Sequence, residues 1–190
     1  MKTLPRRAVV FTIAALLLAA TSLAQTAQPE DAAKPSAPSQ TQTVPADDLS
    51  TPESTVAAVY AAISGPAGER NWARLRNICL PEVHFIVTGV NKEGAAFHRV
   101  LTIDDYQQRA TPVMMKEGFY ERGIARRTVR YGHIAHVFTT YESRHEPDAK
   151  PFARGINSMQ LLTDGKRWWV VNILWDSETP DQPIPQEFLK

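Results

Sequence analysis

The 190-residue chain is long enough for one domain of ordinary size, and its 43% hydrophobic and 22% charged residues are normal for a protein with a packed core. Without the three basic residues of the N-terminal segment, the chain has 18 basic and 20 acidic residues and a net charge of −2. That balance excludes the strong positive charge typical of nucleic-acid-binding proteins. A single cysteine, Cys79, excludes an internal disulfide.

Residues 1–24 have the pattern of a signal peptide. Lys2, Arg6 and Arg7 precede an uncharged, Ala- and Leu-rich stretch, which ends in the small-x-small sequence Ser22-Leu23-Ala24. Cleavage is therefore predicted before Gln25. An uncleaved anchor is the alternative, but the apolar stretch is shorter than the roughly 20 residues that span a bilayer. We expect a periplasmic or secreted protein with no stable membrane anchor after cleavage.

Residues 25–50 are rich in Ala, Pro, Ser and Thr and have almost nothing to bury, which predicts a disordered linker. One folded domain is expected over residues 51–178. It begins with a helix capped by Ser50 or Thr51, since a cap followed by Pro52 is a helix-start signal. Residues 179–190 are expected to form a C-terminal tail.

Apolar spacing in the first half of the domain predicts three helices and two strands. The helices are expected from the cap to Gly65-Pro66, over Glu69–Cys79, and from a Thr102 cap toward Pro112, and the strands over Val83–Thr88 and Phe97–Leu101. After Gly118 the apolar period changes to two, which predicts four long strands: Phe119–Tyr131, His133–Arg144, Arg154–Thr163 and Lys166–Asp176. This order indicates an α+β fold in which three helices pack on one face of a curved antiparallel or mixed sheet.

Asp164-Gly165 is the strongest hairpin signal in the chain and predicts a two-residue turn that pairs Thr163 with Lys166. Counting outward places Asn157 opposite Asn172 on one face. The opposite face then carries four apolar residues that we expect to form a dimer interface: Trp169, Val171, Ile173 and Trp175.

The two asparagines would lie among apolar neighbours, where a buried amide needs a partner or a ligand. A ligand pocket is therefore predicted from four residues: Asn157, Asn172, Tyr106 and Tyr141. A satisfied structural amide pair is the alternative. No pair among the five histidines has the spacing of a metal site, so neither a metal nor another cofactor is predicted.

The order of elements, and the stretches ERNWARLRNICLPEV and YESRHEPDAKPFARGINSMQLLTDGKRWWVVNILWD, resemble the nuclear transport factor 2-like superfamily over roughly residues 52–178. The likeness is greatest to small exported bacterial members, which include relatives of the SnoaL-like polyketide cyclases. The resemblance implies a cone-shaped sheet with a pocket at its mouth, commonly in a homodimer. It does not imply an activity, since the superfamily contains isomerases, dehydratases, hydrolases and many non-enzymes.

The same resemblance suggests two catalytic candidates. The Trp175-Asp176 pair is similar to the end of the last strand of SnoaL-like cyclases, in which an aspartate does acid/base work. Steroid-isomerase-like members carry a catalytic carboxylate on the strand after the second helix. Here that strand reads EVHFIVTG, with His84 in the strand and Glu82, its one carboxylate, at the start. The strand therefore departs from the pattern of the isomerase-like members.

Three functions follow as hypotheses. The first is an exported domain whose apolar pocket binds a small hydrophobic ligand, acting as an accessory module rather than an enzyme. The second is a lyase, isomerase or hydrolase that acts on a small hydrophobic substrate by side-chain acid/base catalysis. The third is an assembly-only domain with a filled core.

Overall fold

The structure is a computed structural model that describes residues 47–190; the expected signal peptide and most of the expected linker lie outside the described residues. Its elements, in chain order, are α1 (Pro52–Ile63), α2 (Trp72–Ile78), β1 (Cys79–Val90), β2 (Ala96–Leu101), α3 (Ile103–Met114), β3 (Tyr120–Tyr131), β4 (Ile134–Arg144), β5 (Ala153–Thr163), β6 (Trp168–Ser177) and the 3-10 turn η1 (Gln186–Leu189). Within this range, none of the helices combines the length and apolar character needed to cross a bilayer.

Helices α1 and α3 begin at capping boxes. The Thr51 side chain accepts the backbone N–H of Ser54, and the Thr102 side chain accepts that of Asp105. In return, the side chains of Ser54 and Asp105 accept the backbone N–H groups of their cap residues. Helix α2 begins three residues later than predicted. The residue before its Asn71 cap, Arg70, turns back, and its buried guanidinium donates to four backbone carbonyls in residues 63–68.

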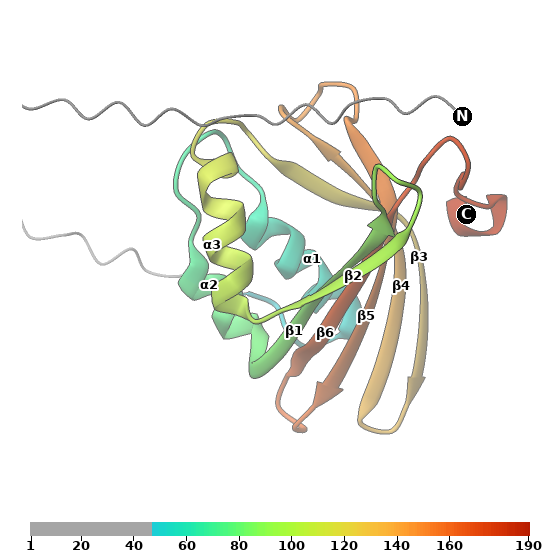
Figure 1. The fold of residues 1–190 in the computed structure, drawn as a ribbon. Helices are drawn as coiled ribbons and strands as arrows, with labels where there is room; N and C mark the ends of the chain where they lie inside the picture. The colour runs from blue at the N-terminus through green and yellow to red at the C-terminus, as the bar shows by residue number, and fades with distance from the viewer. Residues whose placement is uncertain (1–46) are drawn as a thin grey trace, which may run out of the picture. The chain divides into compact units, whose positions relative to one another are not determined.

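The six strands form one sheet in the order β2-β1-β6-β5-β4-β3. Strands β1 and β6 are parallel and all other neighbours are antiparallel, so the sheet is mixed. Figure 1 shows the curved sheet with α1, α2 and α3 on one face, called here the inner face, while the C-terminal segment crosses to the outer face. The predicted α+β fold, with three helices on one face, is confirmed.

The core fills the space between the inner face and the helices. Its fully buried side chains come from α1, α2 and the central strands: Val56, Val59, Leu75, Ile78, Val137, Met159, Leu161 and Val170. Cys79 is buried where α2 passes into β1, and burial raises the pKa of its thiol to about 12. A thiol in this state is unreactive at neutral pH.

The predicted register of the β5–β6 hairpin is wrong. Thr163 pairs with Trp168, because Asp164 Oδ1 accepts the N–H groups of Lys166 and Arg167 and so holds a four-residue loop in place of a two-residue turn. Val171 then forms a β-bulge, an extra residue on β6 between two successive pairs. Beyond this bulge, the side chains of β6 point to the face opposite to the one predicted.

A second bulge lies in β3. Gly123 pairs with Tyr141 while Ala125 pairs with Thr140, so Ile124 is the extra residue. On the hairpin side of the bulge, even-numbered residues of β3 face inward. On the other side, odd-numbered residues do, and Glu121 is among them, opposite Ser143.

Asp47 and Leu49, near the end of the expected linker, pack on the domain. Asp47 accepts three hydrogen bonds from the Arg74 guanidinium, and Leu49 is buried, with its carbonyl accepting the backbone N–H of Trp168. The tail also packs on the domain, since Ile184 is buried and the Phe188 ring lies 5.1 Å from that of Phe138 on β4.

Candidate functional site

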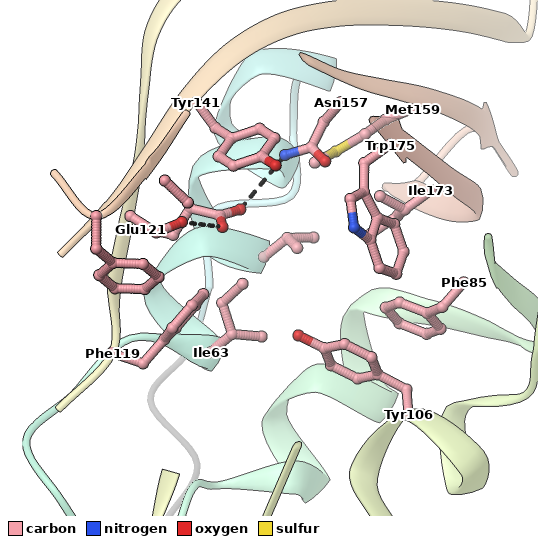
Figure 2. Close-up of a pocket in the computed structure, with 14 residues that line it drawn as sticks. Ile63, Phe85, Tyr106, Phe119, Glu121, Tyr141, Asn157, Met159, Ile173 and Trp175 are labelled. Atoms are coloured by element: carbon pink, nitrogen blue, oxygen red, sulfur yellow. Dashed lines mark hydrogen bonds between the residues drawn. The ribbon is translucent and has the colours of Figure 1, made fainter. Parts of the chain in front are cut away.

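A cavity of about 220 Å³ lies between the inner face of the sheet and helices α1 and α3. Figure 2 shows its lining side chains. Most of them are apolar: Val59, Ile63, Phe85, Phe119, Phe152, Met159, Ile173 and Trp175. The cavity is therefore an aromatic-walled space with few polar groups.

Glu121 is the one charged side chain among the described residues that line this cavity. The Ser143 hydroxyl donates to its Oε2 at 2.8 Å, and the Asn157 amide donates to its Oε1 at 3.3 Å. The same Asn157 nitrogen donates to the Tyr60 hydroxyl at 3.1 Å. The backbone of Glu121 is held as well, because its N–H donates to the hydroxyl of Ser64, at the end of α1, at 2.9 Å.

Burial raises the pKa of the Glu121 carboxyl to about 7, against an ordinary value of 4.5. The hydrogen bonds from Ser143 and Asn157 oppose this shift because they favour the ionised form. The result is a carboxyl that holds and releases a proton near neutral pH, the property required of a side-chain acid or base.

Two tyrosines complete the polar lining. The Tyr106 ring stacks on Phe85 at 4.6 Å, and its hydroxyl points into the cavity in Figure 2, with no hydrogen bond to the other residues drawn. Tyr141 shares a 3.1 Å hydrogen bond with Ser177. Burial raises the pKa of both phenols, so both remain proton donors at neutral pH.

Three of the four predicted pocket residues, Asn157, Tyr106 and Tyr141, line this cavity. The fourth does not, because the bulge at Val171 turns Asn172 to the outer face, where its amide donates to Gln160 at 2.8 Å. The predicted pairing of Asn157 with Asn172 is therefore wrong; Asn157 pairs with Trp175.

The bulge also corrects half of the predicted dimer face. Ile173 and Trp175 line the inner cavity, while Trp169 and Val171 are half-buried. Ile173 is 5% exposed, too buried to take part in an open sheet face.

Neither catalytic candidate lies in the cavity. Asp176 is on the outer side, where it accepts the Ser177 N–H and lines a separate groove. His84 is exposed and pairs with Asn172 in the sheet. Among residues 47–190, no group of three or more His, Cys, Asp or Glu side chains could hold a metal.

Sequence reasoning missed Glu121. The strand YERGIARRTVRY is rich in charge, and counting back from the β3–β4 turn without a bulge places Glu121 among the solvent-facing residues. The available signal was Gly123, which lies next to the bulge; a Cβ there would approach Thr139 Oγ1 to 2.8 Å. Glycine in a strand often marks a bulge or a close approach.

No protein-family model and no curated protein matches the chain. Among solved structures, Rv3472 of Mycobacterium tuberculosis, of unknown function, matches with TM-score 0.52 and 9% identity over 73% of this chain and 77% of that one. A cystatin-like-fold protein of unknown function from Nostoc punctiforme matches with TM-score 0.51 and 6% identity over 67% and 89%. An NTF-2 like protein of unknown function from Silicibacter pomeroyi matches with TM-score 0.45 and 13% identity over 66% and 92%. At such identities the likeness is one of fold alone, and the two structures with TM-scores above 0.5 share the α+β fold of this chain.

Proposed function

We propose that the inner cavity binds a small, largely apolar molecule with a polar group, and that Glu121 exchanges a proton with it. The observation that carries the proposal is a single carboxyl, with a pKa of about 7, in a cavity otherwise lined by apolar and uncharged polar side chains. Ligand sites are typically apolar concavities with a few converging polar groups.

The two ends of the site offer complementary chemistry. Ionised Glu121 accepts a proton, and the Tyr106 hydroxyl, kept protonated by its raised pKa, donates a hydrogen bond to an oxygen on the ligand. A donor aimed at a carbonyl oxygen stabilises the negative charge that develops when a proton leaves the neighbouring carbon. This pairing favours proton transfer next to a carbonyl, as in an isomerisation or an elimination.

The size of the cavity limits the ligand. Its volume of about 220 Å³ falls below the roughly 300 to 1,000 Å³ of pockets for drug-sized ligands. The ring centroids of two lining residues, Phe119 and Phe152, lie 6.2 Å apart, and Phe152 is 49% exposed. A molecule with one ring is the size that we expect.

The test uses cyclohexanone and acetophenone in heavy water at pH 7, with exchange of the protons next to the carbonyl followed by NMR. We expect the wild-type protein to accelerate the exchange, and Glu121→Gln to reduce that acceleration by about 100-fold, since an amide cannot take the proton. Glu117→Gln is the matched control, because it removes a carboxylate that is exposed.

Binding without chemistry is the second candidate, favoured by the hydrogen bonds of Ser143 and Asn157 to both oxygens of Glu121. In that case both ketones bind, as detected by shifts in the Met159 methyl resonance, but no exchange is accelerated. Absence of both binding and exchange would contradict the proposed function.

We also propose that the protein is exported to the periplasm or secreted, on the signal-peptide pattern of residues 1–24. Intact mass of the exported form should then correspond to a chain that begins at or near Gln25. A full-length product held in the membrane would contradict this.

A further inference from the structure

A second cavity, of about 350 Å³, lies on the outer side of the sheet beneath the C-terminal segment. It is called here the tail groove and is lined mainly by Phe138, Ile156, Leu174, Asp176, Ile184 and Phe188. We propose that the tail groove binds a small amphiphilic cation, a molecule with an apolar body and one ammonium group. This site is separate from the inner cavity and does not depend on the proposed function.

The tail is held firmly enough to form a wall. Ile184 is 9% exposed, and its backbone N–H donates to Glu178 Oε1 at 3.0 Å. The Thr140 hydroxyl on β4 donates to the carbonyl of Phe188, whose ring also packs on Phe138. Figure 1 shows this segment on the face of the sheet opposite to the three helices.

The charge of the groove is negative. Two carboxylates, Asp176 and Glu178, line it, and no basic side chain does so among the described residues. Glu178 is already engaged, because Arg154 lies 3.6 Å from its Oε2 and the Ile184 N–H occupies its Oε1. Glu178 therefore serves to hold the tail.

Asp176 has a different environment. Its oxygens accept the Ser177 N–H at 2.8 Å and the Gln182 amide at 3.5 Å, and neither donor carries a charge. No ion pair to Asp176 occurs in the described part of the chain. The Asp176 carboxylate therefore lies beside the apolar lining of the tail groove without a neighbouring positive charge.

Asp176 and the apolar lining together favour a ligand that is positively charged. An ammonium group beside Asp176 gains the ion pair while its apolar body covers Leu174, Ile184 and their neighbours. A neutral analogue gains only the apolar contact, and a carboxylate analogue is repelled. Because ion pairs near a surface are weak, we expect a preference of about five- to tenfold for the amine over the neutral analogue.

The test compares phenethylamine, phenethyl alcohol and phenylpropanoate on the full mature chain. Methyl resonances of Leu174 and Ile184 report the tail groove, and that of Met159 reports the inner cavity. We expect the amine to shift the tail-groove methyls at the lowest concentration, the alcohol at a concentration five- to tenfold higher, and the carboxylate not at all.

Asp176→Asn should make the amine bind as weakly as the alcohol while leaving the alcohol unchanged. Asp181→Asn, which removes an exposed charge from the same tail, should leave the preference intact. Glu121→Gln should also leave it intact, which separates this site from the proposed function. Equal binding of amine and alcohol to the wild type, or shifts confined to Met159, would overturn the proposal.

Discussion

The Asn157 amide nitrogen lies 3.3 Å from Oε1 of Glu121, and both side chains reach this point from strands that are not neighbours in the sheet. Asn157 is on β5 and Glu121 on β3, with β4 between them. The contact spans β4 because both residues face the cavity. Asn157 thereby supports the ionised form of a carboxyl that burial disfavours.

Replacing Asn157 with Leu should raise the pKa of Glu121 further. In the wild type the hydrogen bond from Asn157 lowers the pKa of Glu121 and partly offsets the rise caused by burial. Without this bond, the pKa should rise further. A shift of about one pH unit is expected for a hydrogen bond to a charged group. The pKa is measured by recording the NMR chemical shift of the Glu121 carboxyl carbon as a function of pH. Asn172→Leu, on the outer face, is the control, and an equal shift in both variants would refute the role of Asn157.

Glu121→Gln should stabilise the protein in neutral and alkaline solution but not in acid. Below about pH 4.5 the carboxyl is protonated in both the folded and the unfolded chain, so it costs no stability. As the pH rises from 4.5 to about 7, Glu121 ionises in the unfolded chain but stays protonated in the folded one. Because ionisation favours the unfolded chain, the folded state loses stability over this range. The loss is complete above about pH 7 and amounts to about 3 kcal/mol.

Urea unfolding at pH 4 and pH 8 tests this difference between wild type and Glu121→Gln. The variant should match the wild type at the lower pH and exceed it by about 3 kcal/mol at the higher one. Glu82→Gln, at an exposed carboxyl, should show no such pH dependence. An equal change at both pH values would mean that the Glu121 pKa is not raised.

Association should involve the outer face. Tyr131 pairs with Ile134, Ile134 with Leu162, and Leu162 with Trp169, so four large apolar side chains form a row across four strands. Tyr131 is 84% and Ile134 61% exposed. We expect a homodimer at micromolar concentration that covers this row, since monomers seldom expose continuous apolar surface.

Light scattering measures the oligomeric state. Ile134→Asp should yield a monomer, because it places a charge in the covered surface, while Val113→Asp, at an exposed position on α3, should remain dimeric. A monomeric wild type would contradict the expected interface.

Truncation should locate the true start of the domain. A chain that begins at Asp47 keeps the Arg74 ion pair and the Leu49 side chain, whereas one that begins at Thr51 loses both. Burying a leucine contributes about 1.5 to 3 kcal/mol, so the shorter chain should be less stable by about this amount. Urea unfolding of the two chains makes the comparison, and equal stability would show that these residues contribute nothing.

The helices and strands were largely predictable because their signals are local. Thr102 and Asp105 form the capping box that their spacing indicates, and the change to a period of two after Gly118 marks the four long strands. Asn157 could be placed on the cavity side of the sheet because no bulge lies on β5 between it and the Asp164-Gly165 turn.

The rest of the site was not predictable, because a bulge has almost no sequence signature but changes the facing of every residue beyond it. The bulge at Val171 turns the side chains of Ile173 and Trp175 toward the cavity and that of Asn172 toward the outer face. Ile124 turns Glu121 from the solvent side into the cavity. Each bulge reverses the facing of the residues beyond it, and together the two bulges account for the missed carboxyl and the misplaced dimer face.

The bulge at Ile124 also affects how this site can change in evolution. Loss of a single codon there would remove the extra residue and leave a regular ladder, in which Gly123 still pairs with Tyr141 and Glu121 still lies opposite Ser143, facing the cavity. An in-frame deletion of the extra residue would therefore keep the proton-exchanging carboxyl in place and remove only the local distortion of β3. Homologues with and without this residue should share the carboxyl opposite Ser143 and the same core.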